Sequence, residues 1–444
     1  MAKTDKNDRK ELPVTQKPRK LLWMPLDNAA KIYPAARSRS WSNVFRLSAT
    51  LREDVDKACL EGALAVTVRR FPSIAAKLGT GLFWYYIEEL EAPPPIMEES
   101  PSPTVCMRGR DIKKCALRVL VYGKRIAVEF FHSIADGNSG LVFLKALLAE
   151  YIEQKHGVSI PFSDGVLDRR EAPKKSELED CFQRYEKKAP ASRAQKTAYH
   201  LHGTREEDGF VHLVTFTAST SDVRALAKKH GVSVNTLLTA ALAEACLEIQ
   251  AEEIKRLNRR RPVKILVPVD LRRVFGAQTL RNFVLYVTPE IEAKHGNYDF
   301  AELCTLIYHQ MALRATKKEL SAAVATNVKS EKSLFIKLTP LFLKNVIMKM
   351  VFKAVGERKS CLTFSNLGAV SLPSPMQAYI ERFDFVLSVP AAFPWNASAI
   401  SYGDTLSVSF VRSVKESTLE ARFHACLRRL GLRMKVESNS GTVQ

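Results

Sequence analysis

His132, Asp136 and Gly137 are the residues of this chain whose types and spacing could do chemistry. An imidazole titrates at roughly pH 6.5, so His132 could accept a proton at neutral pH and act as a general base. Asp136 follows in the same short stretch, beside a glycine that allows unusual backbone angles and could therefore lock a turn. Histidine and aspartate often lie this close by chance, and a satisfied histidine at a strand end is the plain alternative.

The elements around His132 determine whether its side chain could reach a cleft. The apolar run at residues 126–131 predicts a buried strand that ends at the histidine. Residues 136–139 are typical of a turn and a helix start. Apolar residues at helical spacing over 141–151 then predict a helix. A histidine between these two elements could project into a cleft while its strand stays in a core.

This succession of strand, histidine, turn, Asp-Gly and helix resembles the H-H-x-x-x-D-G motif of the chloramphenicol-acetyltransferase-like superfamily. Condensation domains of peptide synthetases, alcohol acetyltransferases and wax-ester synthases belong to that superfamily. Phe131 stands where the motif has its first histidine. Many members lack that histidine, while the second one is essential. The departure argues against a standard peptide-bond-forming condensation domain more than against acyl transfer.

Two later parts of the chain carry the same resemblance. Bacterial alcohol-acetyltransferase-like proteins, to which the resemblance is closest, have a region similar to Val267-Pro-Val-Asp-Leu-Arg272 and Leu280-Arg-Asn-Phe283. Wax-ester synthase relatives have a segment similar to Ser365-Asn-Leu-Gly368. The resemblance covers about residues 22–432. It implies an α/β (α+β) fold in which two chloramphenicol-acetyltransferase-like subdomains form a V-shaped pseudo-dimer. Each would hold mixed sheets flanked by helices, and the active site would lie between them.

The resemblance also implies roles for single residues. His132 would be the catalytic general base, taking the proton from an acceptor hydroxyl or amine that attacks a thioester carbonyl directly. Asp136 would point away from substrate and pair with an arginine, for which Arg272 is the expected partner, and Gly137 would help to support the site. The candidates for holding the oxyanion or the substrate are Ser365, Asn366 and Asn282, with the backbone N–H near Gly137. A zinc reading lacks a third ligand beside His132 and Asp136, so no metal is expected.

The composition is that of a globular chain long enough for two domains, with 444 residues, 46% hydrophobic and 9% aromatic. Residues 1–20 are predicted to be a disordered basic tail, and 21–165 the N-terminal subdomain with the histidine motif. Charged residues and prolines over 166–205 predict a linker. Residues 206–435 would form the C-terminal subdomain, with strands at 385–389, 398–402 and 406–411 completing its sheet. Residues 436–444 would be a tail.

The net charge of the chain indicates which kinds of partner it could bind. The chain has 67 Lys and Arg against 47 Asp and Glu, a net charge of +20. Nucleic acid, an anionic membrane or a polyanionic ligand would fit this balance, but no nucleic-acid-binding module is recognisable. An acyl-CoA donor or an acidic acyl carrier protein fits equally well. An apolar, lysine-containing helix over 334–354, kinked or divided at Pro340, is expected to cover the cleft, with peripheral membrane contact as the alternative.

Targeting and redox signals are few. No apolar run reaches the length of a membrane span, and residues 1–20 lack the apolar core of a secretory signal, so a cytoplasmic location is expected. The 8 cysteines are scattered without a paired motif and are expected to be reduced, buried thiols.

The function expected from these observations is acyl transfer without a cofactor. The acyl group would pass from a thioester, with acyl-CoA as co-substrate, to a small-molecule alcohol or amine, and no covalent acyl-enzyme would form. The alternatives are a condensation-type enzyme that uses a carrier-protein thioester, and a degenerate member of the superfamily that only binds a ligand.

Overall fold

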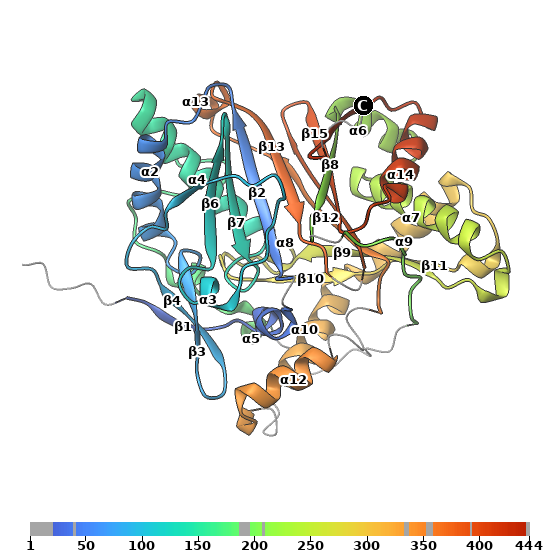
Figure 1. Ribbon diagram of the computed structural model, residues 1–444, viewed down its shortest axis with the longest axis horizontal. Helices are drawn as coiled ribbons and strands as arrows, with labels where there is room; N and C mark the ends of the chain where they lie inside the picture. Colours follow the sequence, from blue (N-terminus) through green and yellow to red (C-terminus); the bar gives the residue numbers. More distant parts are fainter. Residues whose placement is uncertain are drawn as a thin grey trace, which may run out of the picture.

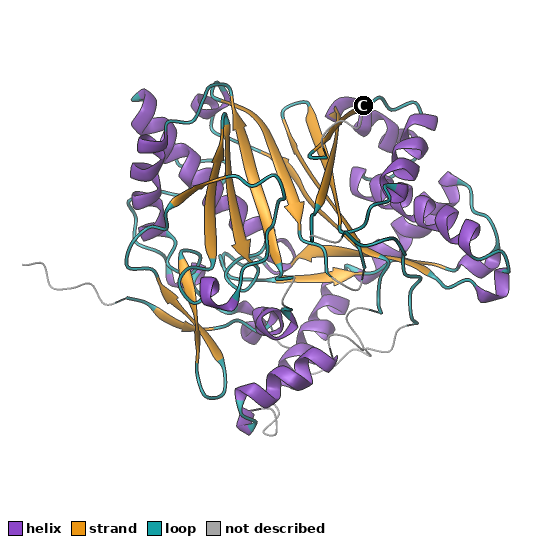
Figure 2. Cartoon of the chain, in the orientation of Figure 1, coloured by secondary structure: helices purple, strands orange, loops and turns teal. Residues whose placement is uncertain are grey.

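The computed structural model describes residues 21–38, 41–185, 196–206, 209–332, 337–351, 358–390 and 393–440. Its strands lie in the middle of the molecule and most of its helices on the outside (Figure 2). The tail predicted at residues 1–20 lies outside the described residues, as do residues 186–195 of the predicted linker. The expected α/β class, with mixed sheets flanked by helices, is confirmed.

The first sheet carries the histidine motif. Its strand order is β13 (Ile380–Leu387), β2 (Val44–Leu51), β7 (Arg125–Phe131), β6 (Leu117–Tyr122) and β5 (Ile96–Glu98). All neighbours are antiparallel except β5 and β6. Helices α2 (Lys57–Arg70) and α4 (Gly137–His156) pack together along this sheet, at the left of Figure 1. A small sheet of β1 (Trp23–Pro25), β4 (Tyr85–Glu89) and β3 (Ala76–Thr80) lies below it.

The second sheet has the order β10 (Val284–Val287), β9 (Val263–Asp270), β12 (Leu362–Val370), β14 (Trp395–Tyr402), β15 (Thr405–Arg412), β8 (His212–Ser219) and β16 (Lys435–Ser438). Strand β11 (Glu290–Ile291) also pairs with β9. It is a mixed sheet, because β12 runs parallel to both β9 and β14. The helices around its core are α6 (Thr220–Lys229), α7 (Val234–Glu253), α9 (Phe300–Arg314) and α14 (Thr418–Arg429).

Shorter elements connect these layers. They are η1 (Ala29–Lys31), α1 (Ile32–Ala36), α3 (Gly109–Ile112), η2 (Lys175–Glu177), α5 (Cys181–Arg184), η3 (Leu257–Arg259), α8 (Leu271–Phe275), η4 (Ala293–His295) and α13 (Ser374–Gln377). Two longer helices, α10 (Lys317–Lys332) and α12 (Leu341–Val351), lie at the lower edge of Figure 1. Helix α12 begins directly after Pro340, as predicted from the missing N–H and fixed φ of proline. Helix α10 was not predicted.

One strand lies in a different sheet from the one predicted. The strand expected near residues 385–389 was assigned to the second sheet, but β13 pairs antiparallel with β2 in the first sheet. Phe383 and Phe385 enter the first core, while Val386 faces a separate small cluster. β13 therefore contacts core side chains on both faces, although its second face also carries the charged Asp384. Alternation along a strand shows which residues share a face, but it does not identify the partner strand. The C-terminal half thus completes the sheet that carries the histidine motif.

The division of the chain at residues 166–205 stays a prediction. Within that segment, the described residues up to 185 pack on the first half. Arg70 donates to Glu177 at 2.7 Å, and Arg169 donates to Glu150 at 2.8 Å, with all four side chains buried. Buried ion pairs of this kind hold a segment in place, because each charge would be costly without its partner.

Membrane spans were sought among the described helices. None of them alone combines the length and the hydropathy of a span. Only α6 and α7 together meet those criteria, and they are bent by 79° at their junction.

Candidate active site

His132 follows the last residue of β7 and lies where elements from both halves of the chain meet. Its backbone N–H donates to the Asn43 carbonyl at 2.8 Å, and this bond extends the pairing of β2 and β7 by one residue. Its half-buried imidazole stacks on the Tyr33 ring at 4.5 Å and meets the edge of Phe45 at 5.2 Å. Nδ1 lies 3.2 Å from the amide oxygen of Asn282, a residue from the second half of the chain. The ring is therefore held on several sides rather than free to rotate.

The Asn282 amide determines which imidazole nitrogen carries the proton. Its Nδ2 donates to the Ser133 carbonyl at 3.4 Å, so Oδ1 faces the His132 ring. An amide oxygen can only accept a hydrogen bond, and Nδ1 must therefore be the protonated nitrogen. This leaves Nε2 with its lone pair, in the tautomer that a general base at Nε2 requires.

Electrostatics favour the neutral imidazole. Burial lowers the pKa of His132, because a charged ring would lose hydration, and this outweighs the opposite effects of nearby Asp136 and of the Asn282 bond. A histidine with a lowered pKa is unprotonated at neutral pH. The site therefore holds a base that is ready to accept a proton.

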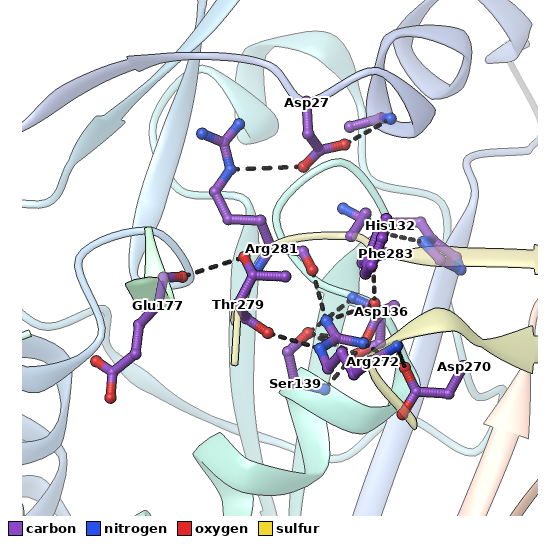
Figure 3. Close-up of polar contacts among 12 residues, drawn as sticks. Asp27, His132, Asp136, Ser139, Glu177, Asp270, Arg272, Thr279, Arg281 and Phe283 are labelled. Atoms are coloured by element: carbon purple, nitrogen blue, oxygen red, sulfur yellow. Dashed lines mark hydrogen bonds and ion pairs between the residues drawn. The ribbon is translucent and has the colours of Figure 1, made fainter. Parts of the chain in front are cut away.

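Asp136 is almost fully buried and is surrounded by donors. One oxygen accepts from the Ser139 backbone N–H at 3.0 Å, which caps α4. The other accepts from Arg272 Nη2 at 2.8 Å and from the Phe283 N–H at 3.0 Å (Figure 3). Burial alone would raise the pKa of Asp136, but the Arg272 charge and these bonds outweigh it and keep that pKa below its usual range. The expected ion pair with Arg272 is present.

Arg272 connects the motif to the second half of the chain. It follows β9, in the short helix α8, and its guanidinium also donates to Asp270 at 3.0 Å, to the Thr279 carbonyl at 2.6 Å and to the Arg281 carbonyl at 2.5 Å. A planar guanidinium with several donors can bind all of these acceptors at once. These contacts hold the turn that precedes Asn282, so Arg272 helps to position the Asn282 amide beside His132.

The segment from Ser365 to Gly368 approaches the motif at Gly137. A Cβ at Gly137 would lie 2.8 Å from Leu367 Cδ2, so a larger residue at this position would require the Leu367 side chain to shift. Ser365 and Asn366 are half-buried, and the Asn366 oxygen accepts from the Gly368 N–H at 2.8 Å within its own bulge. The structure thus brings this part of β12 to the start of α4. The role of Ser365 and Asn366 toward an oxyanion stays a prediction.

Two residues near His132 were missed as parts of the site. Tyr33 lies in α1, where no sequence pattern marks its stacking on the imidazole. Asp27 is buried beside Arg281, 3.5 Å between Oδ2 and Nε, and accepts from the Ala30 N–H at 2.8 Å. Burial raises the pKa of Asp27 to about 6, although the Arg281 charge opposes it.

Metal ligands were also sought. In the parts of the chain that the structure describes, no group of three or more His, Cys, Asp or Glu side chains could hold a metal ion. His132 and Asp136 are bonded to the protein groups described above, and the Asp136 carboxylate already accepts several hydrogen bonds.

Comparison with known proteins gives the class of fold. Neither the scan against protein-family models nor the search of curated proteins found a match. Solved structures do match over nearly the whole chain. Polyketide synthase associated protein 5 from Mycobacterium tuberculosis has a TM-score of 0.58 at 18% identity, covering 91% of this chain and 96% of that one. TRI101 of Fusarium sporotrichioides, solved with coenzyme A and T-2, has a TM-score of 0.59 at 14% identity, covering 94% and 99%.

The epimerization domain from the third module of tyrocidine synthetase B has a TM-score of 0.58 at 13% identity, covering 93% of this chain and 96% of that one. Each of these three proteins shares its architecture with this chain over nearly its whole length. The chain has the fold of the chloramphenicol-acetyltransferase-like and condensation-domain superfamily, as predicted. Identities this low establish the fold, and the activity has to be argued from the site.

Proposed function

We propose that the protein is an acyltransferase that moves an acyl group from a thioester to an alcohol or amine, with His132 as the general base. The observation that carries this proposal is the state of His132: a neutral imidazole whose Nδ1 is occupied by Asn282 and whose Nε2 can accept a proton. Such a base typically contributes about 10²–10⁴ in rate.

The reaction needs no covalent intermediate on the protein. Nε2 of His132 takes the proton of the acceptor hydroxyl or amine while its oxygen or nitrogen attacks the thioester carbonyl. The tetrahedral oxyanion collapses, the C–S bond breaks, and the thiolate leaves with the proton that His132 had taken. The oxyanion needs hydrogen-bond donors, and the candidates are the Ser365 hydroxyl, the Asn366 amide and the N–H near Gly137. Asn282 is already bonded to His132 and is assigned to positioning the base.

Acyl-CoA is the proposed donor. Its phosphates would suit a chain with a net charge of +20. TRI101, solved with coenzyme A, and a trichothecene 15-O-acetyltransferase have this fold and support the reading. The condensation domain of the polyketide synthase MokA has it too, so a carrier-protein thioester stays the second candidate.

The proposal is tested by measuring the free thiol that is released from the thioester donor. Purified protein is mixed with acyl-CoAs of increasing chain length and a panel of alcohols and amines, and the thiol is measured with a chromogenic reagent. Acceptor-dependent release from acyl-CoA supports the proposal, and release only from acyl carrier protein selects the condensation-type alternative. Intact-mass measurement should find no acylated protein during turnover. Binding of acyl-CoA without any thiol release, for every acceptor, would indicate a degenerate ligand-binding protein.

Acyl transfer is expected to rise with pH and then to level off. The base must be neutral, so activity falls as pH drops through the pKa of His132. Burial lowers that pKa, and the midpoint should therefore lie below that of a free imidazole, at roughly pH 6.5. The measurement is kcat/KM against pH at constant ionic strength. A midpoint above that of free imidazole would contradict the assignment of a buried, neutral base.

Asn282→Ala is expected to lower kcat by up to about 10²-fold with little change in KM, because the imidazole loses the partner that holds its tautomer. The Asn282 bond raises the pKa of His132, so the pH midpoint should also move down. Asn396→Ala is the matched control: this buried amide bonds to Ser388 and Thr363 and does not contact His132. The control variant should leave the pH midpoint unchanged, whatever its effect on stability. Equal pH profiles for the Asn282 variant and the wild type would exclude a positioning role.

A further inference from the structure

Helix α12 presents most of its apolar side chains to solvent, whereas its polar residues Lys344 and Asn345 face the protein. Exposed residues are Phe342 (73%), Leu343 (44%), Val346 (52%), Ile347 (38%) and Met350 (59%). At 3.6 residues per turn these five cover an arc of roughly 140°. Surface helices of globular proteins normally turn this arc to the core. An apolar face of this width is a mark of a binding surface.

Contacts on the protein-facing side of α12 hold the helix with its apolar side chains toward solvent. Lys344 is buried, donates to the Phe83 carbonyl at 2.9 Å and lies 3.5 Å from the centre of the Trp84 ring. Asn345 donates to the Tyr85 hydroxyl at 2.8 Å. A buried ammonium group needs such partners, because it has lost its hydration. Rotating α12 to hide its apolar face would leave Lys344 without them.

The turn between β3 and β4 extends this face. The Leu341 N–H donates to the Leu82 carbonyl at 2.9 Å, so helix and turn lie side by side at the lower edge of Figure 1. Leu82 in that turn is 73% exposed, and Leu338, just before the helix, is 71% exposed. We call the exposed side chains of α12 with Leu82 and Leu338 the apolar end of the molecule.

Charge distinguishes between the partners that could cover this end. Lys337 and Lys349 are exposed at either end of α12, and the whole chain carries +20. A second copy of so basic a chain would be repelled, whereas anionic lipid headgroups would be attracted. Apolar side chains flanked by lysines are what an interfacial helix needs to lie in the headgroup region.

We propose that the apolar end docks on an anionic membrane surface. Phe342, Val346 and Met350 would enter the boundary between headgroups and acyl chains, with Lys337 and Lys349 facing the phosphates. Helix α12 packs against α1, whose Tyr33 stacks on His132. Docking would therefore hold the α1 side of the candidate site toward the lipid.

The experiment is co-sedimentation of the full chain with vesicles, which needs no enzymatic activity and so is independent of the acyltransferase proposal. The wild type should bind vesicles of phosphatidylcholine and phosphatidylglycerol, and bind those of phosphatidylcholine alone more weakly. Phe342→Ser/Val346→Ser should weaken binding at least about tenfold, because two anchors are lost. The matched control is Phe162→Ser/Val436→Ser, exposed residues of the same types elsewhere, which should bind like the wild type.

A second variant guards against misfolding of the first. Lys337→Gln/Lys349→Gln leaves the apolar side chains in place and should weaken binding roughly fivefold for each lysine at low salt. Three results would overturn the proposal: no binding by the wild type, a folded Phe342→Ser/Val346→Ser variant that binds unchanged, or a wild-type dimer that this variant dissociates. The last would make a second copy of the chain the occupant of the apolar end.

Discussion

His132→Ala should lose acyl transfer by about 10²–10⁴-fold, because the only proposed proton acceptor is removed. The loss should fall on kcat, since the imidazole is assigned to the chemical step rather than to donor binding. Thiol release at saturating acyl-CoA measures it, alongside acyl-CoA affinity by calorimetry. The melting temperature should change little, because the half-buried ring gives up one stacking contact and one hydrogen bond.

His156→Ala is the matched control for this loss. His156 is another half-buried imidazole; it stacks on Tyr379 at 4.3 Å and pairs with Glu53 at 2.7 Å, at the far end of α4. Removing it should shift the melting temperature by a similar amount and leave thiol release intact. Near-wild-type turnover by His132→Ala would refute the general-base mechanism.

Asp136→Asn should destabilise the fold by about 3–5 kcal/mol, the usual cost of breaking a buried ion pair. Every partner of the Asp136 carboxylate donates a hydrogen: Ser139 to one oxygen, Arg272 and Phe283 to the other. An asparagine amide would turn its NH₂ toward one of these donors whichever way it is placed. Activity should fall as well, because Asn282 and His132 would shift. Chemical unfolding monitored by circular dichroism measures the loss of stability.

A double-mutant cycle with Arg272→Met isolates the pair. We expect a coupling of about 0.5–3 kcal/mol, the range for residues in direct contact. Asp270→Asn is the control, because Asp270 pairs with the same guanidinium but is less buried than Asp136, and asparagine keeps its cap on α8. It should cost roughly 1 kcal/mol or less. Additive losses in the cycle would mean that Asp136 is anchored without Arg272.

The same ion pair should make stability depend on acid pH. The pKa of Asp136 is held below its usual range in the folded protein, so its contribution is complete above the unfolded pKa of roughly 3.9. It is lost as pH falls through the lower folded pKa. The Asp136→Asn variant should therefore lose less stability than the wild type between neutral pH and this acid range.

The histidine motif and its supporting elements were predictable from the sequence because their causes are local. An apolar run ending at His132 formed β7, the Asp136 side chain capped the following helix, and the apolar spacing beyond it formed α4. Strand alternation, capping and helical spacing act over a few residues, so the sequence displays them directly. The pairing of Asp136 with Arg272 came from the resemblance to known acyltransferases rather than from any local pattern.

The neighbours of His132 were decided by tertiary structure. Asn282 was a candidate for contacting substrate, but it bonds to the imidazole across 150 residues of sequence and determines its tautomer. Tyr33 reaches the ring from a short helix with no distinguishing pattern, and β13 joins the first sheet, a pairing that the alternation within the strand does not identify.

Helix α12 shows the same division on the surface. Its sequence predicts an apolar helix over 334–354 that Pro340 kinks or divides, and the structure has a helix from Leu341 to Val351. Which side faces solvent depends on Lys344 and Asn345 finding Phe83, Trp84 and Tyr85, residues far away in the chain. The sequence by itself determined the strand and the helix that flank His132, because their physics is short-range. Only the tertiary structure decided which side chains surround that residue and which apolar face stays exposed, because these depend on contacts between distant segments.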